Sequence, residues 1–203
     1  FATRLRSGEA PELSEAFEDA TFDRDMFVAL LQGDAVIVCA TNAERMFYNE
    51  YVRKVTMGAA NTPPQVGERL VAYAGGQDEG YVNGQSGEIL SVEAVDGRNH
   101  LIEVDVGGRT VTSVVNIAEM LRSDQQKARS AVIGQYQRGK AKQSELWKDA
   151  WTFGYALTAH KAQGSQWRDV YMKRHPLHGW MDEPNRWLYT AVTRAEERVM
   201  LLE

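Results

Sequence analysis

Residues 156–167, ALTAHKAQGSQW, place a dense polar group directly behind a short apolar run: Thr158, His160, Lys161, Gln163, Gly164, Ser165 and Gln166. The hydroxyl, imidazole and ammonium groups of the first three all donate to phosphate oxygens without reading base sequence. Gly164 permits a close backbone approach, and the amide of Gln166 can bond a ribose or a phosphate. Polar side chains packed this densely behind an apolar run seldom serve a core, so the stretch predicts a binding role, although a hydrogen-bonded core histidine explains His160 equally well when it is taken alone.

A second candidate is Arg194 in RWLYTAVTRAEER, where it follows Thr193 in a largely apolar stretch. An unpaired arginine is costly to bury among apolar neighbours. A positioned arginine can stabilise the charge that develops when a triphosphate is split. The alternative is a structural salt bridge with Glu196, Glu197 or a neighbouring helix. Arg198 is interpreted only as a structural partner.

The elements that position these groups are predicted from apolar patterns. AVIVCA, residues 35–40, is a continuous apolar run of the kind found in sheets covered on both faces. Thr41 and Asn42 open a helical pattern that ends at Gly58. Strand, polar turn and helix form the first half of a βα unit, which places functional groups at the carboxyl ends of strands. Thr41, Asn42 and Asn49 are candidate ligand contacts, and capping or turn roles explain them at least as well.

Residues 62–115 follow a different pattern. They are rich in valine and glycine, and turn signals at Asn83-Gly84, Asp96-Gly97 and Gly107-Gly108 are spaced for short hairpins. We predict a small antiparallel barrel inserted into an α/β domain. Residues 1–61 and 116–203 would then form the two parts of that α/β domain.

The remaining elements are expected on both sides of this insertion. Before it, the apolar residues between Ser14 and Leu31, among them Phe17 and Phe22, fit short helices that stop at Gly33. After it we expect a basic helical stretch over Ile117–Lys148, one strand over TFGYALTAH, a second over DVYMK, and a helix followed by a strand at Val199–Leu202.

Composition excludes several classes of protein. The chain has 203 residues, of which 43% are hydrophobic, which suits one large domain or two small ones. A single cysteine, Cys39, cannot build a disulfide framework or a cysteine-rich metal site. No apolar run approaches the roughly 18 residues that a membrane helix needs, so we expect a cytoplasmic protein without a membrane partner. The chain opens with Phe1 and shows no basic-then-apolar leader, so part of a longer protein is expected.

The formal net charge of -5 argues against a wholly basic, nonspecific nucleic-acid binder. The charges are unevenly distributed, however. Basic residues gather at Lys127–Lys148, where solvated helix faces are the simpler explanation, and again at Arg168–Arg174. GQYQRGKA, Gly134–Ala141, matches most of a phosphate-loop pattern, but Ala141 replaces the hydroxyl that would hold magnesium and no strand precedes it. We therefore predict that it binds no triphosphate.

Three stretches resemble motifs of superfamily-one helicases. VIVCATNAERMFYNEYVRKV is similar to motif IV, GYALTAHKAQGSQW to motif V, and RWLYTAVTRAEERVMLLE to motif VI. The order of motif IV, barrel, motif V and motif VI resembles the RecD-like and phage Dda-like branch, which inserts a small Src-homology-type barrel into its second motor domain. The resemblance covers about residues 30–203 and implies a RecA-like parallel-sheet motor domain, with the fold of P-loop NTPases but without its own phosphate loop.

The resemblance implies the C-terminal part of an ATP-dependent DNA helicase, which couples ATP hydrolysis to translocation on single-stranded DNA and to unwinding. ATP and Mg²⁺ would be the cofactors, with Mg²⁺ held mainly by a first motor domain that this chain lacks. Replication or repair proteins are candidate partners. The alternative is a noncatalytic remnant that binds nucleic acid or protein.

The resemblance also assigns roles to individual residues. Cys39 and Ala40 stand where related helicases often carry an arginine, so no cationic phosphate contact is expected there. The implied roles are catalytic for Arg194, nucleotide-binding for Gln163, Gly164, Ser165 and Gln166, and single-stranded-DNA-binding for Thr158, His160, Lys161, Thr41 and Asn42.

Overall fold

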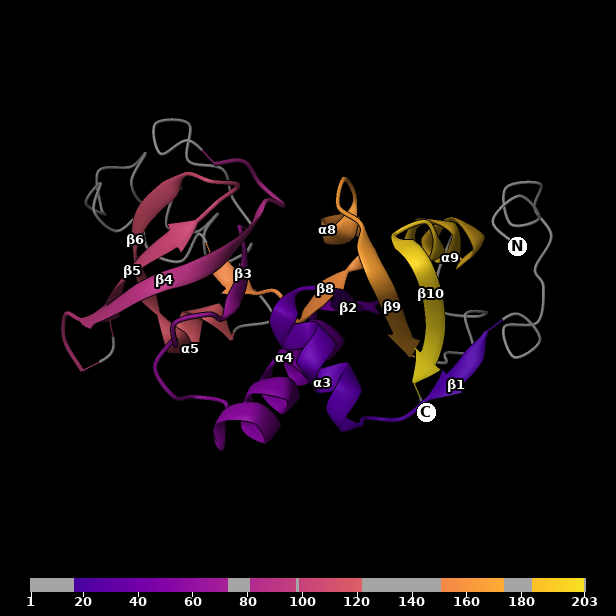
Figure 1. Cartoon of the computed structure of the whole chain (residues 1–203), viewed down its shortest axis with the longest axis horizontal. Helices are drawn as coiled ribbons and strands as arrows, with labels where there is room; N and C mark the ends of the chain where they lie inside the picture. The colour runs from indigo at the N-terminus through magenta and orange to yellow at the C-terminus, as the bar shows by residue number, and fades with distance from the viewer. Residues whose placement is uncertain (1–16, 73–80, 98, 122–150, 174–183, 203) are drawn as a thin grey trace, which may run out of the picture. The chain divides into compact units, whose positions relative to one another are not determined.

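The computed structural model describes residues 17–72, 81–97, 99–121, 151–173 and 184–202. The chain divides into two compact units, one formed by residues 1–48 and 155–203 and the other by residues 49–154. The first unit is built on a parallel sheet and the second on an antiparallel sheet (Figure 1). These boundaries differ from the predicted insertion at residues 62–115, because the antiparallel unit takes residues on both sides of that range.

The parallel sheet has five strands in the order β1-β10-β9-β2-β8. All neighbouring pairs are parallel, as predicted for an α/β domain. The strands are β1 (Glu18–Ala20), β2 (Ala35–Cys39), β8 (Ala156–Thr158), β9 (Trp167–Lys173) and β10 (Ala195–Leu202). Every residue of β2 is buried, which agrees with its continuous apolar sequence and its position between two other strands.

The helices of this unit begin and end at local signals. In α3 (Arg24–Gln32) the Asp23 carboxylate accepts from Met26 N at 2.8 Å, and Gly33 closes the helix at φ 79°. The helix α4 (Asn42–Met57), of which residues 49–57 belong to the second unit, begins after Thr41 and ends before Gly58, as predicted. The short helix α8 (Ala159–Ala162) follows β8, and α9 (Pro184–Val192) packs against β9 and β10.

The prediction of short helices between Ser14 and Leu31 was wrong in part. Residues 18–20 form β1, which pairs with residues 200–202 of β10, so Phe17 and Phe22 flank a strand. Phe22 stacks on Phe27 and on Tyr48, with ring centroids 5.9 Å apart in both pairs. A partner strand about 180 residues away in sequence therefore outweighed the local helical pattern. Residues 14–16 lie outside the described part of the chain.

The antiparallel sheet has the strand order β6-β5-β4-β3-β7. Its strands are β3 (Arg69–Ala72), β4 (Ser86–Ala94), β5 (Asn99–Asp105), β6 (Thr110–Asn116) and β7 (Trp151–Phe153). At the predicted glycine turns, Gly84, Gly107 and Gly108 have positive φ, whereas Gly97 does not. A four-residue helix, α5 (Ile117–Met120), follows β6. The rest of the predicted basic helix, including the phosphate-loop-like Gly134–Ala141, lies outside the described residues.

The single strand predicted over TFGYALTAH is in fact two strands. It breaks at Gly154, so that β7 pairs with β3 in the antiparallel sheet and β8 pairs with β2 in the parallel sheet. The Gly154 amide donates to Arg69 O at 2.9 Å, and a Cβ at Gly154 would lie 3.3 Å from a Val71 methyl group. The close backbone approach of β3 explains the glycine at this break.

A buried arginine holds the loop that leads into β3. Arg53 Nε and Nη2 donate to the two carboxylate oxygens of Glu68 at 2.8 and 3.0 Å, and Arg53 Nη2 also donates to Pro63 O at 3.0 Å. Arg53 Nη1 donates to Ala60 O, and the guanidinium carbon lies 4.2 Å from the centre of the Phe153 ring. Both charged side chains are fully buried and neutralise each other's charge, so we assign the pair a structural role.

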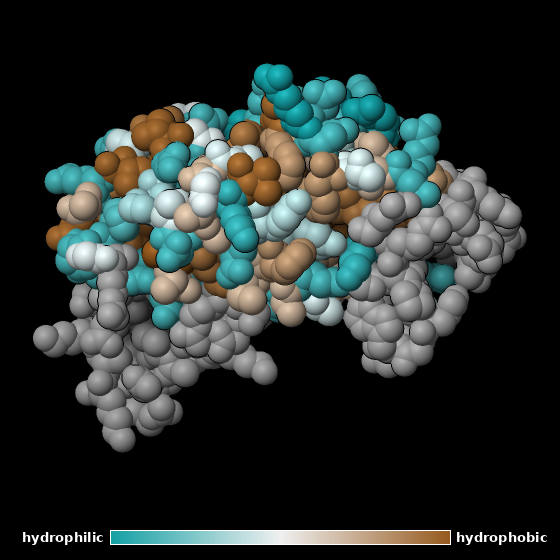
Figure 2. All heavy atoms as spheres, turned by 90° about the horizontal axis from the view of Figure 1, so that it is seen from below, coloured by the Kyte–Doolittle hydropathy of each residue, from teal (hydrophilic) through white to brown (hydrophobic). Residues whose placement is uncertain are grey.

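Exposed large apolar side chains come from separate elements and loops, and the face drawn in Figure 2 shows apolar groups separated by polar ones. They are Val28, Phe47, Val55, Val66, Val82, Leu90 and Val95. Such scattered residues are ordinary for a protein surface and indicate no docking site by themselves.

Candidate functional site

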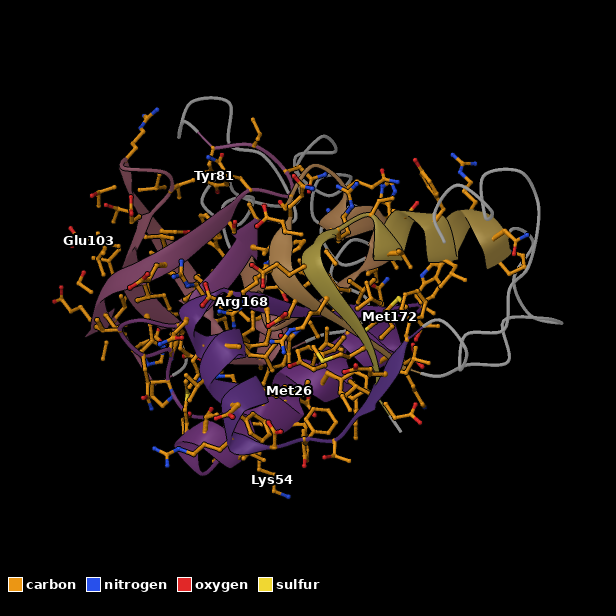
Figure 3. All side chains as sticks on the ribbon, turned by 45° about the vertical axis from the view of Figure 1, so that its right-hand side comes forward. Met26, Lys54, Tyr81, Glu103, Arg168 and Met172 are labelled. Carbon is orange, nitrogen blue, oxygen red and sulfur yellow. The ribbon has the colours of Figure 1, made fainter. Side chains whose placement is uncertain are left out.

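The candidate site residues are divided between the two edges of the parallel sheet. Residues at or just after the ends of β2 and β8 lie at the edge where these strands end, which we call the carboxyl edge: Thr41, Asn42, Thr158, His160 and Lys161. Residues that precede β9 and β10 approach the opposite edge, the amino edge: Gln163, Gly164, Ser165, Gln166 and Arg194. In Figure 3, Arg168 and Met172 mark the two ends of β9.

The β2 side of the carboxyl edge is arranged as a helix cap. Thr41 Oγ1 accepts from the Glu44 amide at 3.1 Å, and Glu44 Oε2 accepts from the Ala40 amide at 3.2 Å. This reciprocal pattern resembles a capping box and supports the capping interpretation of Thr41. The Thr41 hydroxyl hydrogen is not used in this contact and can still be donated. Asn42 is the first residue of α4, and its side chain is exposed.

The β8 side of the carboxyl edge carries three polar side chains on one turn. Thr158 pairs across the sheet with Cys39 and occupies the position before α8, but its side chain makes no capping hydrogen bond. His160 is exposed and Lys161 is half-exposed. The structure therefore brings Thr158, His160 and Lys161 together on one short turn that follows a buried strand.

Beneath the carboxyl edge, Cys39 is a buried thiol. Burial, more than the neighbouring Glu44 carboxylate, raises the pKa of Cys39 well above its usual range, so the thiol stays protonated and unreactive. Burial likewise raises the pKa of Tyr48 to about 12. The nearby Arg45, at 4% exposure, was not singled out from the sequence. Its amide makes an ordinary helical hydrogen bond to Thr41 O at 3.1 Å, so no local sequence signal distinguishes Arg45.

At the amino edge, Arg194 is held by neutral oxygen atoms. Its Nη1 donates to Ser165 O at 3.1 Å, its Nε to Thr190 O at 3.2 Å and its Nη2 to Thr193 Oγ1 at 3.2 Å. Within the described residues no carboxylate pairs with Arg194, and the salt bridge with Glu196 or Glu197 is not formed. The half-buried guanidinium is oriented, and no carboxylate in the described ranges compensates its positive charge.

The loop before β9 carries the other residues of the amino edge. Gly164 has φ 92°, a left-handed conformation that favours glycine, and a Cβ there would meet no atom within 4 Å. The chain itself therefore requires this glycine for its backbone conformation, with open space beside it. Gln163 and Gln166 are exposed, and the Ser165 amide donates to Ala162 O at 3.3 Å. The structure thus brings the backbone of Ser165 to Arg194 and leaves both glutamine side chains exposed.

A second arginine near the amino edge has a structural role, as the sequence analysis proposed. Arg198 Nε and Nη2 donate to the two carboxylate oxygens of Asp169, both at 2.7 Å. Arg168 Nε also donates to Asp169 at 3.2 Å, and Arg168 Nη1 lies 3.5 Å from the Asp34 carboxylate. The hydrogen bonds from Arg198 hold the pKa of Asp169 below its usual value although burial opposes this.

Residues 153–202 match the UvrD-like helicase C-terminal domain. This segment contains both β8 with its polar turn and the helix and strand on either side of Arg194. No curated protein sequence matches the chain.

Solved Pif1 helicases share this fold. A Pif1 helicase from Bacteroides in complex with ADP-AlF3 and single-stranded DNA is 13% identical, with a TM-score of 0.53, and the match covers 98% of this chain and 47% of that one. Pif1 from Candida albicans is 15% identical, with a TM-score of 0.53, over 100% of this chain and 52% of that one. The chain therefore spans about half the length of the helicases that it matches.

Two further observations concern the described residues alone. None of the helices in the described ranges is long and apolar enough to cross a membrane. The same residues contain no group of three or more histidine, cysteine, aspartate or glutamate side chains that could hold a metal ion. The placement of Mg²⁺ on another motor domain stays a prediction.

Proposed function

We propose that the chain is the second motor domain of an ATP-dependent DNA helicase, which couples ATP hydrolysis to translocation on single-stranded DNA and to unwinding. The observation that carries the proposal is Arg194: an oriented, half-buried arginine without a carboxylate partner among the described residues, within the segment that matches a helicase domain. Such a group can stabilise the charge that develops on a transferred phosphoryl group.

The two edges of the parallel sheet would then have different ligands. Gln163, Gly164, Ser165 and Gln166 would face the nucleotide together with Arg194, and Thr158, His160, Lys161, Thr41 and Asn42 would face the DNA strand. The Bacteroides Pif1 structure contains ADP-AlF3 and single-stranded DNA, which supports both ligands for this chain. Mg²⁺ would neutralise charge on the phosphates and would be held mainly by the other motor domain.

The proposal is tested with the complete protein that contains this chain. We expect ATP hydrolysis that is stimulated by single-stranded DNA, and ATP-dependent separation of a forked duplex. The RecD-like and Dda-like resemblance supports movement from 5′ to 3′, so a duplex with a 5′ overhang should be unwound faster than one with a 3′ overhang. Binding of DNA without any stimulated turnover would favour the noncatalytic remnant instead.

We also propose that the antiparallel unit is a small barrel of the Src-homology type that helps to grip the strand. The five-stranded antiparallel sheet supports this proposal and determines which deletion can test it. Because β7 pairs with β3, deletion of residues 67–115 alone would leave β7 without its partner. Replacement of residues 59–153 by a short linker should preserve DNA-stimulated hydrolysis and weaken unwinding. Unwinding at the normal rate would contradict a role in gripping DNA.

A further inference from the structure

The basic residues at Arg168–Arg174 are divided between the two ends of β9. Arg168 lies at the amino edge, where it pairs with Asp34 and Asp169. Lys173 is the last residue of β9 and lies at the carboxyl edge, with 45% of its side chain exposed. The three residues before it are buried, and the residues directly after it lie outside the described part of the chain. The carboxyl edge therefore carries a further cation to which the sequence analysis assigned no role.

The register of the parallel sheet places Lys173 in one row with a residue already proposed to bind DNA. Cys39 pairs with Thr158 across β2 and β8. On the other side of β2, Val38 pairs with Met172, so the next step sets Cys39 beside Lys173. Burial raises the pKa of the Cys39 thiol most, and the charge of Lys173 opposes that rise, which agrees with a lysine beside the thiol. Lys173 and Thr158 thus end the strands on either side of β2, two strand spacings or about 10 Å apart.

Glu44 connects Lys173 to the β2 side of this edge. Its Oε1 lies 4.0 Å from Lys173 Nζ, the outer limit of an ion pair, and its Oε2 accepts from the Ala40 amide at 3.2 Å. The Glu44 amide donates to Thr41 Oγ1 at 3.1 Å. Among the described residues Lys173 has no other charged partner. An exposed pair of this kind contributes little to stability, so its lysine can exchange the carboxylate for another anion.

We infer that Lys173 is a further contact for the phosphate backbone of single-stranded DNA, which extends the binding surface of the carboxyl edge from β8 across β2 to β9. The inference rests on the proposed function, in which this edge faces the DNA strand. An ammonium donates to phosphate oxygens without reading base sequence, and a row of such groups can follow the backbone. The separation of Lys173 from Thr158 equals about three phosphate spacings of a stacked strand, at about 3.4 Å each, so the two side chains would meet different phosphates.

The test measures binding of a fluorescein-labelled oligothymidylate to the complete protein, without nucleotide, over a range of KCl concentrations. Lys173→Gln should weaken binding about three- to tenfold and lower the slope of log affinity against log salt by about 0.7. Lys173→Arg keeps the charge and should bind within about twofold of the wild type. Arg168→Gln is the matched control, because Arg168 lies on the same strand, is 42% exposed and also pairs with carboxylates, but at the amino edge. Its salt slope should match that of the wild type.

Two further variants distinguish a phosphate contact from a surface ion pair. Glu44→Gln keeps the capping acceptor, because glutamine also serves at this position of a capping box. If Lys173 exchanges Glu44 for a phosphate, Glu44→Gln should tighten binding about twofold. Lys161→Ala combined with Lys173→Gln should then lower the slope by about 1.4, twice the value for one contact. If the pair is only structural, Lys173→Gln and Glu44→Gln should lower the unfolding temperature equally and leave DNA affinity unchanged, which would overturn the inference.

Failure of this inference and failure of the proposed function give different results. A normal salt slope in Lys173→Gln together with a lowered slope in Lys161→Ala would overturn the role of Lys173 alone. A wild-type protein that binds no oligothymidylate would overturn both. A lowered slope in Lys173→Gln that Lys173→Arg restores, with a normal slope in Arg168→Gln, supports the contact whatever the rate of ATP hydrolysis.

Discussion

The two edges of the parallel sheet use their charged groups differently. At the amino edge Arg168 and Arg198 both pair with the Asp169 carboxylate, so these charges stabilise the fold. Arg194, at the same edge, donates only to neutral oxygens. At the carboxyl edge Thr41 and Glu44 are engaged in capping, whereas Thr158, His160 and Lys161 lie on a partly exposed turn. A charge that is paired with a carboxylate, such as that of Arg198, stabilises the fold, whereas the charge of Arg194 can meet an anionic ligand. The amino edge should therefore affect turnover, and the carboxyl edge should affect DNA affinity.

The largest effect is expected from Arg194→Ala in the complete protein. Hydrolysis stimulated by saturating single-stranded DNA should fall by about 100-fold or more, equivalent to about 2.7 kcal/mol of barrier. Affinity for single-stranded DNA should change little because the carboxyl edge is intact. Arg194→Lys should recover little activity, since an ammonium cannot reproduce the planar guanidinium that donates in three directions. Steady-state hydrolysis and a fluorescence anisotropy titration measure the two quantities.

Arg186→Ala is the matched control, because Arg186 is an exposed arginine of α9, the helix that precedes Arg194. It should leave turnover near normal. Near-normal turnover in Arg194→Ala would remove the main support for the motor function. Equal losses of turnover and DNA affinity in Arg194→Ala would erase the contrast between the two edges and indicate a folding defect.

The second effect concerns the compensated charges of the amino edge. Asp169→Asn should lower the free energy of unfolding by about 1–2 kcal/mol at pH 7, since the charge-assisted hydrogen bonds to Arg198 are partly exposed to water. Because the pKa of Asp169 is lowered in the folded state, its contribution is complete above about pH 5. It is lost as the pH falls through the ordinary aspartate pKa of 3.8 towards the lower pKa of the folded state.

Urea unfolding of both proteins between pH 7 and pH 3 provides the measurement. The difference between wild type and Asp169→Asn should shrink as the solution is acidified. Arg168 faces the same carboxylate from β9 and should retain part of the effect when Arg198 is replaced. A difference that is constant or grows in acid would show that Asp169 does not contribute through its charge.

The carboxyl edge should show the opposite behaviour to Arg194. Lys161→Ala should weaken binding of single-stranded DNA about three- to tenfold and lower the slope of log affinity against log salt by about 0.7, the value for one phosphate contact. His160→Ala should act in the same direction with a smaller effect. Turnover at saturating DNA should stay within about twofold, because Arg194 lies at the other edge.

Lys54→Ala removes an exposed lysine of α4 and is the control for loss of charge alone (Figure 3). Its salt slope should match that of the wild type. If Lys161→Ala also leaves the slope unchanged, the turn after β8 does not bind phosphates. DNA contacts would then have to come from elsewhere.

What the sequence could and could not predict follows from the range of the interactions. The start and end of α4 were predictable because Thr41, Glu44 and Gly58 act within a few residues. The strands β1 and β7 have three residues each and depend on distant partners, so local patterns misplaced them. The sequence indicated Arg194 as a candidate site residue. Its contact with Ser165, 29 residues away, could be identified only from the folded structure.

The smallest effect decides between two roles for one hydroxyl group. Thr41→Ala removes the acceptor for the Glu44 amide at 3.1 Å and should cost about 1 kcal/mol of stability. Thr41→Ser keeps that acceptor and should restore most of the loss. If Thr41 only caps α4, DNA affinity and its salt dependence should be unchanged in both variants at a temperature well below unfolding. If its remaining hydroxyl hydrogen also binds a phosphate, Thr41→Ala should weaken DNA binding and Thr41→Ser should not. Thermal unfolding and anisotropy titration on the same samples separate these outcomes, and a DNA defect without a stability defect would place Thr41 with Thr158 in the ligand-binding part of the carboxyl edge.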